Sequence, residues 1–192
     1  MDINNEQVMK AVEQAVETSD LAPWDIPNID LYMDQVITIF EDTLRGNKRR
    51  EEDKLLTKTM INNYSKAGIV QPVKGKKYSK DHILQMLLIY NLKQTLSISD
   101  IERLTQGLQE DGQLPEHLAE IYEEFLEEKK KQRTAFTAQF SEDMKSAAPI
   151  KTHTDLYKIV LSLCSMSNFL KLAAERIIDD YFDVPQKRAK EK

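Results

Sequence analysis

Apolar residues recur every three or four positions through most of the last third of the chain, which is the spacing of one face of an α-helix. One such run extends from about Pro115 to Met144 and a second from about Thr154 to Phe182, with Pro149 between them. Five Gly and six Pro in 192 residues also favour long helices over many short strands. We therefore expect a mainly α protein that ends in a helical hairpin or bundle. The second run forms a wide apolar stripe of Leu156, Ile159, Val160, Leu163, Leu170, Ala174, Ile177, Ile178 and Tyr181.

Shorter helices are expected upstream of these two runs. Apolar spacing and capping residues predict helices over about 4–18, 31–45, 57–67 and 81–94, and a short helix after the capping-box pair Ser97 and Asp100. The helix over 81–94 is apolar on nearly every side, so it should be buried. Thr57 and Ser79 are expected N-caps, and Gly68 is an expected helix stop.

The connections between these helices carry further expectations. Asp30 is a plausible N-cap for the helix over 31–45, and residues 46–54 are expected to form a surface loop. Trp24 lies between two prolines, and we expect its indole to fill the core. Residues 70–78 are expected to form two short β segments around Lys74 and Gly75.

The charge of the chain is unevenly distributed. The formal net charge is −5, yet residues 54–80 contain seven lysines and neither Asp nor Glu. A solvated surface usually mixes charges of both signs, so a basic block in an acidic protein is a distinctive feature. A local positive field of this kind is what a polyanionic partner requires.

The sequence "MINNYSKAGIV" followed by "KKYSKDHILQMLLIYNLKQTLSISDIERL" resembles the N-terminal DNA-binding domain of MerR-type regulators, over about Leu31–Leu108. The matching positions are Ile61, Tyr64, Lys66, Gly68, Ile69, Tyr78, Ser97, Ile98 and Ile101. Several positions depart from that pattern. Asn62 stands where the family has an arginine and Asn63 where it has its first tyrosine, Leu55 replaces the glycine of the tight turn, and Gly75-Lys76 replaces the tyrosine-arginine pair of the wing. The whole chain also resembles a bacterial family catalogued as domain of unknown function 1836.

The MerR resemblance implies a winged helix-turn-helix over 31–112 that binds double-stranded DNA, with a recognition helix at about 57–67 and a basic wing at about 70–78. The candidate DNA-binding residues are Thr57, Lys58, Thr59, Asn62, Asn63, Tyr64, Lys66, Lys74, Lys76 and Lys77. Asn62, Asn63 and Thr59 are expected to form hydrogen bonds with base edges, and the lysines are expected to contact phosphates. Tyr64 could donate to a phosphate or pack beneath the helix.

The same resemblance implies a homodimer that reads two half-sites, and a small-molecule effector. Residues 1–30 would form an N-terminal helix and a Pro/Trp loop, 113–184 a dimerisation or effector region, and 185–192 a charged tail. The long helices could instead only complete a monomeric bundle. A different hypothesis keeps the helix-turn-helix shape without DNA binding, as a protein-interaction module whose lysines bind an acidic protein surface.

Little in the sequence suggests catalysis, so we expect no enzyme activity, cofactor or metal. His82, His117 and His153 lie in separate segments, and the five glycines are isolated from one another. Cys164, the chain's single cysteine, is expected to be a buried, inert thiol and cannot form an internal disulfide, which fits a cytoplasmic protein. No uninterrupted apolar run approaches the roughly 18 residues of a membrane-spanning segment, so we expect no membrane association.

Overall fold

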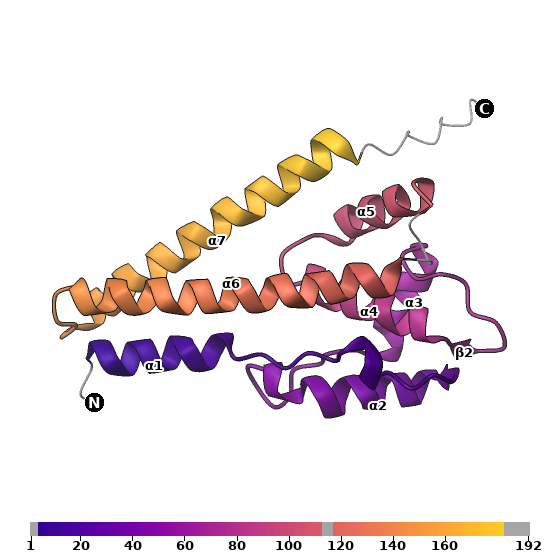
Figure 1. Ribbon diagram of the computed structural model, residues 1–192, viewed down its shortest axis with the longest axis horizontal. Helices are drawn as coiled ribbons and strands as arrows, with labels where there is room; N and C mark the ends of the chain where they lie inside the picture. The colour runs from indigo at the N-terminus through magenta and orange to yellow at the C-terminus, as the bar shows by residue number, and fades with distance from the viewer. Residues whose placement is uncertain (1–3, 113–116, 183–192) are drawn as a thin grey trace.

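The computed structural model describes residues 4–112 and 117–182. Across these residues the protein is mainly α, with a small antiparallel sheet, as the sequence predicts (Figure 1). The helices are α1 (Asn5–Val16), α2 (Met33–Leu44), α3 (Lys58–Lys66), α4 (Lys80–Leu92), α5 (Ile98–Glu110), α6 (Leu118–Ser146) and α7 (His153–Tyr181). Strands β1 (Leu31–Tyr32) and β2 (Lys77–Tyr78) form the sheet, and Pro23–Asp25 and Arg45–Asn47 are short 3-10 helices. The expected charged tail over 185–192 lies outside the described residues.

One hydrophobic core holds the molecule together, and it is built around α4. Ile83, Leu84 and Met86 have no exposed surface, which confirms the prediction that this helix is buried. The core extends without a break from Leu21 to Tyr122. Residues on both sides of the expected 31–112 domain therefore share its core.

Local capping chemistry defines the ends of several helices as the sequence predicts. The Thr57 hydroxyl accepts a hydrogen bond from the Met60 amide at 3.1 Å. Ser97 and Asp100 bond to each other's backbone amides at 3.2 and 3.3 Å, which is the reciprocal capping box. Gly68 follows α3 with φ of +73°, a conformation that glycine adopts without steric cost.

Two expectations for the connection before α2 were wrong. The Trp24 side chain is not in the core, because the residue is 75% exposed. Pro23 is buried in its place, together with Leu21 and Ile26, and the indole is turned outward. Asp30 is not the N-cap of α2, because the chain first pairs as β1 and the helix begins only at Met33.

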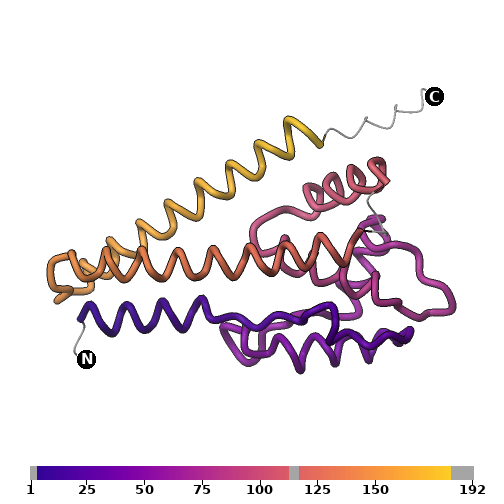
Figure 2. Tube along the Cα trace, viewed as in Figure 1, coloured from indigo at the N-terminus to yellow at the C-terminus, as the bar shows by residue number. Residues whose placement is uncertain are grey.

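Helix α7 departs most from a compact bundle. It turns back at the end of α6 and then diverges from it, so that its C-terminal end lies over α5 (Figures 1 and 2). Within α7 only Ile178 is buried. Four of the nine residues of the predicted apolar stripe, Val160, Leu170, Ile177 and Tyr181, are exposed, and another four are half-buried. Cys164 is exposed, so the expectation of a buried thiol was wrong.

Candidate nucleic-acid interface

Helix α3 is amphipathic and presents its polar side to solvent. Ile61 and Tyr64 are buried, and the side chains between them are exposed. The exposed residues are Lys58, Thr59, Asn62, Asn63 and Lys66, which are five of the ten candidate DNA-binding residues. A helix therefore lies at the position expected for the recognition helix, and its polar face is exposed to solvent.

Two candidate residues of this segment serve the fold. The hydroxyl of Thr57 is engaged in capping α3. Tyr64 is buried on the inner side of the helix, which is one of the two roles expected for it. Burial raises the pKa of its hydroxyl. The Tyr64 carbonyl accepts hydrogen bonds from the Ile69 and Val70 amides at 3.0 and 3.3 Å, which leads the chain out of α3 towards the wing.

A tight turn presents the wing lysines. The Lys77 amide donates to the Lys74 carbonyl at 3.1 Å, and the intervening Gly75 and Lys76 have φ of +61° and +60°. Two positive φ values in succession are typical of the type I′ turn of a β-hairpin. Lys74, Lys76 and Lys77 are all exposed on this turn.

The wing is not the expected pair of adjacent β segments. Before the turn only Lys74 forms a β-bridge, to Lys77, and the partner of β2 is β1, with Leu31 opposite Tyr78. Pro72 has no amide hydrogen to donate, which makes the preceding segment a poor strand. Pairing with β1 instead attaches the basic turn directly to the start of α2.

The start of α2 brings the two basic segments together. Lys58 at the beginning of α3 forms an ion pair with Asp34 at 2.7 Å, between side chains that are both largely exposed. Lys77 of the wing lies over the ring of Tyr32, with its Nζ 5.4 Å from the ring centroid. Because Tyr32 and Asp34 are two residues apart, the start of α3 and the wing both contact the start of α2.

Sequence reasoning missed two residues of this region. Asp34 places a carboxylate beside the lysine block, although it lies outside that block in the sequence. Lys93 donates from Nζ to the Leu55 carbonyl at 3.1 Å, which holds the segment leading into α3, and burial lowers the pKa of its amine. No local pattern indicates either contact, because each joins residues far apart in the chain.

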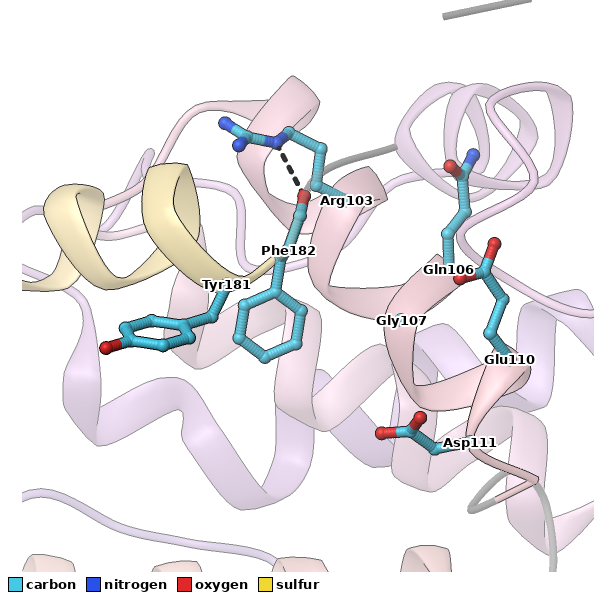
Figure 3. A pocket seen from close by; sticks show the side chains of 7 residues that line it. All are labelled: Arg103, Gln106, Gly107, Glu110, Asp111, Tyr181 and Phe182. Carbon is cyan, nitrogen blue, oxygen red and sulfur yellow. Dashed lines mark hydrogen bonds between the residues drawn. The ribbon is translucent and has the colours of Figure 1, made fainter. Parts of the chain in front are cut away.

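The described residues contain no group of three or more His, Cys, Asp or Glu side chains placed to hold a metal. A hollow of about 180 Å³ lies between α5 and the end of α7, lined by Arg103, Gln106, Gly107, Glu110, Asp111, Tyr181 and Phe182 (Figure 3). Arg103 donates there to the Phe182 carbonyl at 3.1 Å, the Ile178 carbonyl at 2.9 Å and the Asp179 carboxylate at 2.8 Å. These bonds fasten α7 to α5, and we call this set of contacts the α5–α7 latch.

Comparison with protein families matches residues 21–125 to DUF1836, a domain of unknown function. The chain belongs to the DUF1836 family. The matched segment coincides with the hydrophobic core from Leu21 to Tyr122, so the DUF1836 unit includes α2 to α5 and the start of α6, while α7 lies beyond it. Neither the curated proteins nor the solved structures contain a match.

Proposed function

We propose that this DUF1836 protein is a transcriptional regulator that binds double-stranded DNA through a MerR-like winged helix-turn-helix. The observation that carries the proposal is that α3, through Lys58, and the basic wing, through Lys77, both contact the start of α2, at Asp34 and Tyr32. Exposed cationic side chains from two elements thereby adjoin a polar helix face. The order of helix, loop, short helix, basic turn, buried helix and capped short helix supports the same assignment.

In this proposal α3 enters the major groove, which is wide enough for an α-helix. Asn62, Asn63 and Thr59 contact base edges, since an asparagine amide can bond adenine at two positions. Lys58, Lys66 and the wing lysines Lys74, Lys76 and Lys77 contact phosphates, which supply affinity and register. Thr57 and Tyr64 hold the helix in place, so we assign them no contact with DNA.

The remaining parts of the proposal follow from the resemblance to MerR-type regulators. The protein would act in the cytoplasm as a homodimer on two half-sites, and a small molecule would control it. The dimer is expected because a two-fold symmetric protein matches a palindromic operator.

A second function is supported by Asp34 and by the two asparagines of α3. The carboxylate of Asp34 already compensates Lys58, and Asn62 replaces the arginine of the MerR pattern. Both features weaken a surface that binds the closely spaced phosphates of DNA, and the remaining exposed lysines could still bind the fewer charges of an acidic protein.

Titration of a generic duplex with the full-length protein over a range of salt concentrations tests the proposal. Contacts to about five phosphates predict a slope of log affinity against log salt of about −4 to −5. Reversing the charge at Lys74, Lys76 and Lys77 to Glu should reduce that slope by about three, because about 0.9 counterion is released per phosphate contact. The helical circular dichroism signal should stay unchanged, since all three side chains are exposed.

A matched control reverses three exposed lysines far from the wing in the chain, Lys131 and Lys145 of α6 and Lys151 just before α7, and thus makes the same change in net charge. This control should keep most of the affinity for the duplex. If the wing and control variants lose affinity equally, the binding is a non-specific charge effect. If the wild type does not bind a duplex at low salt, the docking module becomes the better assignment.

Selection from a random duplex pool tests sequence preference separately. Asn62→Ala and Asn63→Ala should each change the selected consensus, because each removes a base contact, while the salt slope should hardly change.

A further inference from the structure

Helix α7 exposes more apolar surface than a surface helix of a monomeric protein normally does. Nine of its large apolar residues are more than half exposed: Tyr157, Val160, Leu161, Met166, Phe169, Leu170, Leu172, Ile177 and Tyr181. A helix that is apolar on several sides is normally buried. Contiguous apolar patches larger than a few hundred Å² commonly mark interaction sites.

Seven apolar residues of α7 follow the spacing of helices that pair along their length. Intervals of three and four alternate through Leu156, Ile159, Leu163, Met166, Leu170, Ala173 and Ile177, which we call the α7 seam. This alternation is the repeat of a coiled coil, in which apolar knobs fit between the side chains of a facing helix. The exposed fractions of Met166 and Leu170, at 58% and 66%, show that no facing helix covers the middle of the seam.

A groove runs along the seam, between α7 and α6. Its first part, of about 430 Å³, lies between Phe136 and Phe140 of α6 and Ile159, Leu163 and Met166 of the seam. Its second part, of about 470 Å³, shares Phe136 and is lined by Leu126 of α6, Val16 of α1 and Leu170. Polar side chains line it as well, namely Asp20, Lys129, Lys130, Gln132 and Arg133. The seam thus forms one wall of an apolar groove whose other walls are α6 and α1.

The chain's own contacts keep this groove open. At one end of α7, Arg103 bonds to the backbone of Ile178 and Phe182 and to Asp179. In the turn before α7, the side-chain nitrogen of Asn5 donates to the Met144 carbonyl and its side-chain oxygen accepts from the Ile150 amide, both at 2.8 Å. With this turn and the C-terminal end of α7 both held, α7 cannot close onto α6 without breaking the α5–α7 latch.

We propose that the α7 seam is the interface with a second copy of this chain, whose own α7 lies in the groove. Six of the nine exposed side chains lie on the seam or three or four residues from a seam residue: Val160, Met166, Phe169, Leu170, Ile177 and Tyr181. Together they offer roughly 500–700 Å², taking about 150–250 Å² for each fully exposed aromatic residue and somewhat less for each aliphatic one. A stable interface buries about 800 Å² on each partner, and the half-buried Ile159 and Leu163 and the walls of the groove supply the remainder. A seam with one regular repeat is complementary to itself, as a two-fold interface requires. This inference does not rest on DNA binding.

A lipid bilayer is the other environment that an apolar helix of this length suits. By length and composition α7 could cross a membrane. However, Lys158 and Lys171 bracket the uncharged stretch 159–170, which rises only about 18 Å at about 1.5 Å per residue. The hydrocarbon core of a bilayer is about 30 Å thick, so both lysines would have to lie near or within it.

Sedimentation of the full-length protein over a range of micromolar concentrations tests the proposed dimer against the chain mass of 22.3 kDa. The wild type should sediment at twice this mass. The variant Met166→Glu with Leu170→Glu should dissociate at least about 100-fold more readily, because the added carboxylates would be buried between the helices. Both side chains are exposed in the single chain, so the helical signal of the variant should match that of the wild type.

The control Ser165→Glu with Asn168→Glu adds the same charge to exposed positions of α7 that lie outside the seam. This control should remain a dimer. A wild type that is monomeric at all concentrations, or a dimer that the seam variant leaves intact, would overturn the proposal. Monomer in buffer together with flotation on phosphatidylcholine–phosphatidylglycerol vesicles would overturn it in favour of a membrane-bound helix.

Discussion

At the scale of single residues, the turn that presents the wing lysines depends on an uncommon backbone conformation. Gly75 and Lys76 both have φ near +60°, and Lys76 is the described non-glycine residue with positive φ. The left-handed conformation costs an L-residue about 1–2 kcal/mol. The turn bond from Lys77 to Lys74 and the pairing of β2 with β1 hold the conformation in place. In the proposed regulator this conformation keeps Lys76 at the tip of the wing.

The Gly75→Ala variant should lose about 1 kcal/mol of unfolding free energy, measured by urea denaturation. No atom lies within 4 Å of the added methyl group, so the cost should come from the backbone conformation alone. Gly46→Ala is the matched control, since Gly46 does not have positive φ and the nearest atom to its added methyl group is 3.7 Å away. Equal stability of the two variants would contradict the described turn.

At the scale of secondary-structure elements, the contact between α5 and α7 depends on a glycine within a helix. Gly107 leaves room for the ring of Phe182, and a methyl group added there would lie 2.7 Å from the Phe182 Cδ1 atom. The adjacent Arg103 then bonds to the Phe182 carbonyl (Figure 3). A small residue on one element and an aromatic residue on the other thus set how α7 approaches α5.

The Gly107→Ala variant should release the end of α7. Alanine favours a helix interior over glycine by about 1 kcal/mol, so α5 itself should remain stable while the Phe182 ring is displaced. Amide hydrogen exchange should accelerate over residues 175–182 and stay unchanged within α5. Arg103→Ala should produce the same exchange pattern through loss of the bonds to α7. Unchanged exchange in both variants would show that the α5–α7 latch does not hold the helix.

At the scale of the whole molecule, α6 connects the DUF1836 core to the N-terminal and C-terminal helices. It packs against α4 and against α1 (Figure 1). Its Lys129 also forms an ion pair at 2.6 Å with Asp20, which follows the end of α1. Asn5 joins α1 to the turn between α6 and α7 through its bonds to Met144 and Ile150. The base of the apolar groove is therefore held by a residue near the start of the chain.

The Asn5→Ala variant should lose about 1–3 kcal/mol of unfolding free energy, because two partly buried backbone groups lose their hydrogen-bond partner. Hydrogen exchange should accelerate in α1 and over residues 144–152, and it should not change in α3 or α4. Gln7→Ala is the control, since this exposed side chain lies on the same helix. An effect of the control as large as that of Asn5→Ala would indicate general destabilisation of α1.

Much of the fold could be predicted because its causes are local. The caps at Thr57 and Ser97, the end of α3 at Gly68 and the burial of α4 depend on residues within a few positions of one another. The exposed polar face of α3 follows equally from its spacing, as Asn62, Asn63 and Lys66 alternate with Ile61 and Tyr64. Capping and helical periodicity act within one or two turns, so the sequence displays them directly.

Only the tertiary structure decided the contacts between distant segments. The pairing of β1 with β2, the ion pair of Lys58 with Asp34 and the outward position of Trp24 depend on neighbours that no sequence spacing specifies. The apolar stripe of α7 illustrates the difference most clearly. Periodicity predicts which side of a helix avoids water, but what covers that side depends on how the rest of the chain packs, and here the chain covers it only in part.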